Sequence, residues 1–195
     1  MPLEEKMEFL KCCSANQRLA FKIVFSCAPV IKGLTSANTL TVKRGVKRQI
    51  DKQLKDTCLS CIPLYIDESK EILMITRLDD LDSYLKKEGT FIYLKEFGYL
   101  ENSIEYVFKK LHYRFKKFYS RQGDFPHELG LLLNYPIEDI KGFIANNGKN
   151  SLLTKYWKVY GNIDEAIKTF KSYDEAFEKS LYEIVSGQQL KEIVA

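Results

Sequence analysis

Long apolar runs are absent from this sequence. No stretch approaches the roughly 20 apolar residues that a membrane-spanning helix requires, and the N-terminus MPLEEKMEFLKCC lacks the apolar segment of a signal peptide. We therefore expect a cytoplasmic protein with no membrane partner. The chain has five cysteines, an odd number. In a reducing compartment this indicates free thiols rather than a disulfide framework.

Repeats, low-complexity segments and flexible linkers are also missing, so the 195 residues predict a single domain, 1–195. The net charge of +4 is too small to make nucleic-acid binding the leading idea. Basic residues do gather in two runs, 41–56 and 109–121. A nucleic-acid binder is therefore kept as a third alternative, which requires both runs to share one exposed face.

Hydrophobic periodicity predicts an α+β fold. We expect a small mixed or antiparallel sheet of about four strands, packed by several helices and including a long C-terminal helix, because strands and helices do not alternate regularly. The first thirty residues favour helix, which Pro29 limits. Further helices are predicted over 44–56, 79–87 (stopping at Gly89), 101–118 and 162–185, and strands over 39–42, 59–66, 71–76 and 152–161.

Special residues are concentrated between positions 124 and 161, which hold one of two histidines and the only tryptophan. Pro126 and Pro136 each stand where a first helical turn can begin. Glu138 and Asp139 place negative charge in the first turn of the second helix, where the helix dipole favours it. This pattern predicts two short helices that turn into a strand.

Two blocks of this sequence carry a family resemblance. The first includes Phe125-Pro126-His127-Glu128, Gly130, Tyr135-Pro136, Lys141-Gly142-Phe143-Ile144, Gly148-Lys149-Asn150 and Trp157-Lys158-Val159-Tyr160-Gly161, and the second includes Cys27-Ala28-Pro29 with Gly33. They resemble the bacterial family called domain of unknown function 3793. That family usually has a histidine before the cysteine, where this chain has Ser26.

The resemblance implies a cytoplasmic bacterial protein whose family has no assigned catalytic residue or cofactor. It also implies an association with redox or iron physiology, because relatives accompany flavodoxin-type and iron-related genes. A flavodoxin-like redox protein is therefore one expected partner. The residues themselves, rather than the resemblance, indicate the other, a small anionic ligand.

One candidate catalytic set is present: Cys27 as nucleophile, His127 as base and Glu128 as the group that orients the base. A thiolate needs a nearby base or a helix N-terminus to lower its pKa. This set would make the protein a thiol-dependent enzyme. The competing interpretation is that Cys27 is a small core residue and that the other two brace a helix start.

The leading interpretation is an accessory module that binds a ligand or partner rather than an enzyme. Lysines near a glycine-containing turn indicate that the ligand is an anion. Glycine lets the backbone come close to the anion, and lysine supplies positive charge. The turn lacks the spacing of a nucleotide-binding motif. The expected binding wall consists of Pro126, His127, Glu128, Tyr135, Lys141, Lys149, Asn150, Trp157, Lys158 and Tyr160.

Cys58 and Cys61 have the spacing of a redox or metal motif. A zinc site needs two further ligands, and only the adjacent pair Cys12 and Cys13 is nearby. The motif also leads into a predicted strand, whereas a thioredoxin-like site begins a helix. We therefore interpret these cysteines as structural thiols and predict no metal site.

Overall fold

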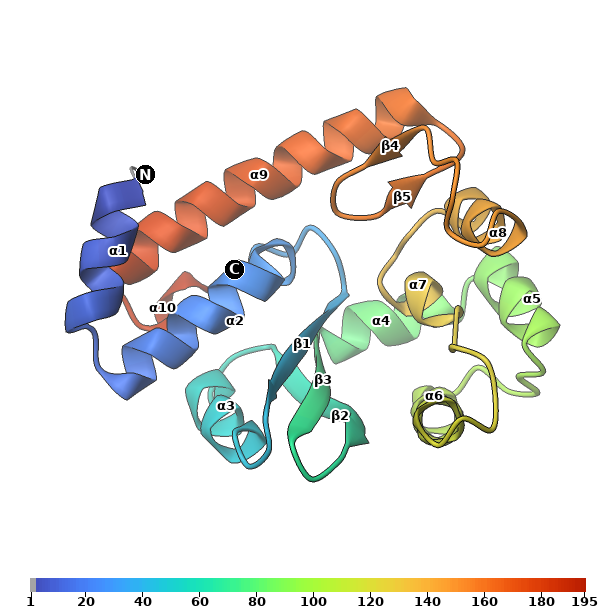
Figure 1. Ribbon diagram of the computed structural model, residues 1–195, viewed down its shortest axis with the longest axis horizontal. Coiled ribbons are helices and arrows are strands. Elements are labelled where there is room, and N and C mark those ends of the chain that lie inside the picture. The colour runs from blue at the N-terminus through green and yellow to red at the C-terminus, as the bar shows by residue number, and fades with distance from the viewer. Residues whose placement is uncertain (1–2) are drawn as a thin grey trace.

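The computed structural model describes residues 3–195 and confirms the α+β fold (Figure 1). Within these residues, three strands form one antiparallel sheet and two form a separate small hairpin. None of the described helices has the length and apolar character to cross a membrane. The helices are α1 (Leu3–Cys12), α2 (Ala15–Ile31), α3 (Lys47–Leu54), α4 (Leu78–Leu85), α5 (Glu88–Glu96), α6 (Ile104–Tyr119), α7 (Leu129–Leu132), α8 (Ile137–Ala145), α9 (Ile163–Val185) and α10 (Leu190–Ile193). The strands are β1 (Ala37–Lys43), β2 (Ser60–Ile66), β3 (Lys70–Thr76), β4 (Leu153–Thr154) and β5 (Lys158–Val159).

The larger sheet has the order β1-β3-β2, so β3 lies in the middle. The strands predicted over 59–66 and 71–76 are confirmed as β2 and β3, which pair as a hairpin. Its turn is closed by Asp67, whose carboxylate accepts hydrogen bonds from the backbone N–H groups of Ser69 and Lys70 at 2.8 and 2.9 Å. This Asx-type turn sets the register of the pair.

Two hydrophobic cores lie on the two faces of this sheet. Leu73 and Ile75 of β3 pack into the first core, with α2, α3, α9 and α10. Ile72 and Met74 alternate to the other face and join the second core, with α4 to α7. The strand β3 is therefore buried on both faces.

The two basic runs are separated by the same sheet. Ile50 of α3 packs into the first core, whereas Val107 and Leu111 of α6 pack into the second. The helices that carry the runs 41–56 and 109–121 therefore cover opposite faces of the sheet. The nucleic-acid alternative stays a prediction.

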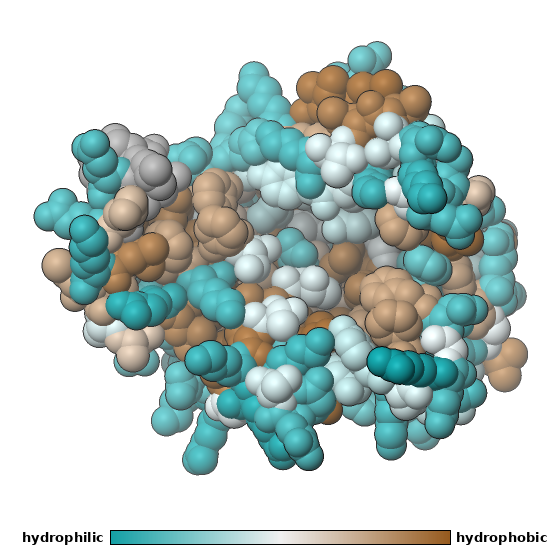
Figure 2. Space-filling model, in the orientation of Figure 1, coloured by the Kyte–Doolittle hydropathy of each residue, from teal (hydrophilic) through white to brown (hydrophobic). Residues whose placement is uncertain are grey.

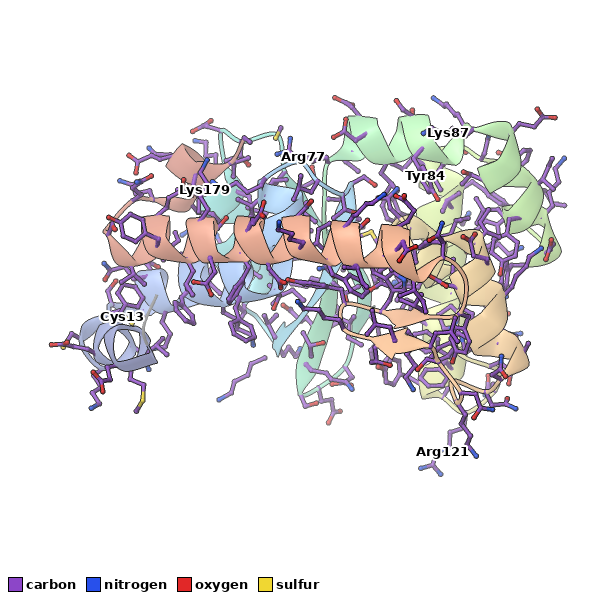
Figure 3. The ribbon with its side chains drawn as sticks, turned by 90° about the horizontal axis from the view of Figure 1, so that it is seen from above. Cys13, Arg77, Tyr84, Lys87, Arg121 and Lys179 are labelled. Carbon is purple, nitrogen blue, oxygen red and sulfur yellow. The ribbon has the colours of Figure 1, made fainter. Side chains whose placement is uncertain are left out.

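The long C-terminal helix α9 begins as predicted. The Asn162 side chain caps it by accepting a hydrogen bond from the Glu165 N–H at 3.1 Å. The helix spans more than half of the molecule, with the β4–β5 hairpin beside its first half (Figure 3). Ile163 and Ile167 point outward and form an exposed apolar patch over its first turns (Figure 2).

Several predicted boundaries are wrong at the N-terminal half. The chain breaks between α1 and α2 because Ser14 and Gln17 form a capping box that starts a new helix. Pro29 lies within the last turn of α2 instead of limiting it. Gly89 does not stop a helix, since α5 runs through it.

The predicted elements between 124 and 161 also need correction. The first short helix, α7, begins at Leu129, three residues after Pro126. The single strand predicted over 152–161 is a hairpin of two short strands. Its tip turns where the Lys155 N–H donates to the Trp157 carbonyl at 3.1 Å. Because of this turn, both strands of the hairpin lie close to the neighbouring helices.

Candidate functional site

A pocket of about 390 Å³ lies between the β4–β5 hairpin and the corner formed by α7 and α8. Its volume falls in the range of small-molecule sites. We call it the hairpin pocket. Its lining consists of Phe125, His127, Leu129, Gly130, Leu133, Tyr135, Asp139, Ile140 and Phe143 on the helical side and of 154–158 on the hairpin side.

Asp139 fixes the hairpin over α8. Its Oδ2 accepts a hydrogen bond from Trp157 Nε1 at 2.7 Å, and its Oδ1 accepts from the N–H groups of Tyr160 and Gly161 at 2.6 and 2.8 Å. The side chain is only 3% exposed. Hydrogen bonds to a carboxylate are stronger than neutral ones, so this residue is the main polar anchor of the pocket roof.

Two glycines let the hairpin approach α8 closely. A Cβ atom on Gly142 would lie 2.3 Å from Tyr160 Cβ, and one on Gly161 would lie 2.4 Å from Glu138 Cγ. Both distances are too short for two carbon atoms, so a larger residue at either position would force its neighbour to move. Both glycines belong to the family-like motifs, and close packing of helix against hairpin explains them.

Aromatic rings form much of the pocket wall. Tyr135 stacks on Trp157 with ring centroids 5.1 Å apart, and Phe170 of α9 meets Trp157 from the side at 4.5 Å. Burial raises the pKa of Tyr135 to about 12. Its hydroxyl therefore stays protonated and donates to the Tyr156 carbonyl at 3.4 Å. The rings are held in place from two sides.

His127 lies half-buried between Phe125 and Phe143, at centroid distances of 5.4 and 5.6 Å. Burial, followed by the nearby Arg114 guanidinium, lowers the pKa of this imidazole, while Asp124 acts in the opposite direction. The ring is therefore neutral near pH 7. Within residues 3–195 its nitrogens have no hydrogen-bond partner, so one donor and one acceptor remain available to the pocket.

Glu128 and Pro126 are buried beneath the pocket lining, and neither residue lines the pocket. The Glu128 side chain is fully buried, with Oε1 at 2.8 Å from Arg114 Nε and 3.0 Å from the Tyr99 hydroxyl. Burial raises the pKa of Glu128, and Arg114 opposes that rise. The carboxylate braces α7 against α6 and does not orient His127.

The predicted lysines are not brought together. Lys158 lines the pocket, where its ammonium donates to the Gly148 carbonyl. Lys141 points to α5 and pairs with Glu96 at 3.3 Å. Lys149 and Asn150 are exposed and lie outside the lining. Tyr160 also lies outside it, with its hydroxyl donating to the Lys149 carbonyl at 3.0 Å.

Cys27 is remote from the pocket. It is 0% exposed in the first core and does not line the hairpin pocket. Burial raises the pKa of its thiol, and the neighbouring Cys61 raises it further. An activated nucleophile requires the opposite shift. The geometry therefore does not assemble Cys27, His127 and Glu128 into a catalytic set.

The CxxC cysteines occupy different environments. Cys58 is exposed, with Arg77 Nη1 at 3.1 Å from its sulfur, whereas Cys61 is buried in β2 and burial raises its pKa to about 12. Among the residues that the structure describes, no three histidine, cysteine or acidic side chains are placed to hold one metal ion.

Several pocket residues were not predicted from the sequence. Asp139 was assigned only to the helix dipole, and Thr154 and Lys155 to a continuous strand. One signal was available: the N–H of a buried tryptophan needs an acceptor, and the acidic first turn of α8 is a nearby source. The other missed lining residues are Phe125, Leu129, Gly130, Leu133, Ile140, Phe143 and Tyr156.

The fold and the pocket define an α+β domain with an aromatic-lined pocket beneath a short β-hairpin. A family model described as "Protein of unknown function (DUF3793)" matches residues 23–194. The chain belongs to this family. No curated protein and no solved structure matches the chain.

Proposed function

We propose that this protein is a binding module whose hairpin pocket takes up a small ligand with an aromatic ring and one anionic group. The observation that carries the proposal is the composition of the pocket lining, which combines aromatic rings with the imidazole of His127 and the side chain of Lys158. A flavodoxin-like redox partner stays a prediction.

The walls favour a flat, apolar ligand body. Tyr135 and Trp157 supply one aromatic surface, and Phe143 supplies another. Aromatic pairs contribute about 0.5–1.5 kcal/mol beyond the area they bury. A ligand ring that entered this pocket would displace water and make such contacts. The hairpin would not need to rearrange, because Asp139 already fixes its position.

The polar groups favour an acceptor on the ligand. Both Asp139 oxygens are occupied by N–H donors, so this carboxylate has little capacity left to bind a cation. His127 can donate one N–H, and Lys158 adds a positive charge. A carboxylate or sulfonate on the ligand satisfies both groups.

The sole tryptophan makes the proposal directly testable, since Trp157 lines the pocket. Two dyes with the same rings serve as probes: anionic 1-anilinonaphthalene-8-sulfonate and neutral N-phenyl-1-naphthylamine. We expect energy transfer from Trp157 to both, with tighter binding of the anionic dye. Absence of transfer at saturating dye would overturn the proposal.

Lysine variants provide the matched control. Lys158→Met should weaken the anionic dye several-fold and leave the neutral dye unchanged, because only the charge contact is lost. Lys149→Met, which alters an exposed lysine outside the lining, should change neither affinity. Equal effects of the two substitutions would contradict the role given to Lys158.

A further inference from the structure

A second cavity, of about 590 Å³, lies at the other end of the molecule. Three segments enclose it: the start of α2, the helix α3 with the loop that follows it, and the link between α9 and α10. Figure 1 shows these segments side by side, away from α7 and α8. We call this space the lysine cavity.

The lysine cavity differs in character from the hairpin pocket. Its lining includes three buried apolar side chains, Ala20, Ile184 and Leu190, but no aromatic ring. Side-chain amides, which both donate and accept hydrogen bonds, dominate the rest. They belong to Asn16, Gln17, Gln49, Gln53, Gln188 and Gln189. Such walls suit a hydroxylated ligand rather than a flat apolar one.

The charge of the lining is positive. Lys52, Lys55 and Lys191 face one acidic residue, Asp56, which leaves two net positive charges. Within residues 3–195, none of these three lysines forms an ion pair. Lys47 of the same helix, by contrast, pairs with Asp51 at 2.8 Å. These lysines are exposed, so their ammonium groups are available to an anionic ligand.

One lining amide is incompletely satisfied. Gln53 Nε2 donates to the Asn16 carbonyl at 2.8 Å, which fixes the orientation of the amide. Its Oε1 is buried and has no hydrogen-bond partner among the described residues. An unpaired buried acceptor is costly, and a ligand hydroxyl would satisfy it.

From these observations we propose that the lysine cavity binds a small phosphorylated polyol, such as a sugar phosphate. Lysine ammonium groups bind phosphate as point charges. The amides of α3 and of the α9–α10 link would receive the hydroxyl groups, with Gln53 Oε1 as one acceptor. This site is separate from the hairpin pocket, so either proposal can fail alone.

Calorimetric titration of the full chain with ribose 5-phosphate, ribose and inorganic phosphate tests the proposal. We expect ribose 5-phosphate to bind more tightly than either part. The emission of Trp157 should stay unchanged, because this residue lies in the other pocket. No heat with ribose 5-phosphate at millimolar concentration, or equal affinity for ribose and ribose 5-phosphate, would overturn the proposal.

Substitutions locate the site. Lys52→Gln and Lys191→Gln should each weaken ribose 5-phosphate about two- to fivefold, as expected for one charge contact at an exposed site. Gln53→Met should reduce its advantage over inorganic phosphate. Lys47→Gln, on the same helix but outside the lining, is the control and should have no effect. Affinity that survives both lysine changes would place binding elsewhere.

Discussion

Trp157 and Asp139 are joined by a hydrogen bond of 2.7 Å that links the hairpin to the first turn of α8. The same carboxylate also accepts two backbone N–H groups of the chain that leaves the hairpin. One buried side chain thus fixes the hairpin that covers the hairpin pocket.

We predict that Asp139→Ala destabilises the protein by about 3 kcal/mol or more, because three donors lose a charged acceptor. Urea unfolding measures the loss, and native Trp157 emission should shift to longer wavelength as the hairpin loosens. Glu138→Ala, an exposed acid in the same turn, is the control and should cost less than about 1 kcal/mol. Equal costs would contradict the anchoring role.

Two glycine substitutions should act in opposite directions. Gly142→Ala places a methyl group against Tyr160 and should destabilise by about 1–3 kcal/mol. Gly89→Ala adds a methyl group in open space within α5 and should stabilise by about 0.4–1 kcal/mol. Thermal unfolding of both variants measures the effects. A neutral Gly142→Ala would mean that the hairpin does not approach α8 closely.

For the buried ion pair of Arg114 and Glu128, we predict that removing one partner costs more stability than replacing both. Arg114→Met leaves an uncompensated buried carboxylate and should cost about 3–5 kcal/mol. The double variant Arg114→Met with Glu128→Gln should recover part of that loss. Failure of the second change to restore stability would show that the pair is not coupled.

Glu128 also predicts a pH dependence. Its pKa is raised on folding, so the folded state binds the proton more tightly. The resulting stability is present below the unfolded pKa of about 4.3 and is lost as the pH rises through the folded pKa. Relative to the wild type, Glu128→Gln should therefore gain stability between pH 4 and neutrality. A constant difference across this range would contradict the raised pKa.

His127 predicts a pH dependence of the opposite sign. Its pKa is lowered on folding, so the stability it contributes is present above the unfolded pKa of about 6.5 and is lost as the pH falls through the folded pKa. His127→Gln should remove this loss, and denaturant midpoints of both proteins across mildly acidic pH measure it. Parallel curves would mean that the imidazole is not desolvated.

Thiol reactivity distinguishes the binding interpretation from the thiol-dependent enzyme. In the native protein the exposed Cys12 and Cys58 should react with iodoacetamide readily, while Cys27 should react only on unfolding. Mass spectrometry of digests taken over time assigns each site. Native labelling of Cys27 as fast as a free thiol would restore the enzyme hypothesis.

The sequence predicted the elements whose apolar spacing is regular, including α6, α9 and the strands β2 and β3. It failed where short-range signals conflict. Gly89 was predicted to stop a helix, but it lies in the first turn of α5, a position that tolerates glycine. Residues 152–161 alternate like a single strand, but the chain turns at Lys155 and forms a hairpin. Tertiary packing against α8 and α9 overrides propensity there.

By itself the sequence determined the α+β class and the neighbourhood of the candidate site, because periodicity and helix-start residues act over a few positions along the chain. It placed His127, Tyr135, Trp157 and Lys158 in one region, and all four line the hairpin pocket. Only the tertiary structure decided that Cys27 lies in a different hydrophobic core and that Lys141 pairs with Glu96 outside the pocket. It also decided that Asp139 fixes the hairpin over the pocket. Those outcomes depend on which distant segments pack together, and packing is set by the shape and burial of the whole chain rather than by local spacing.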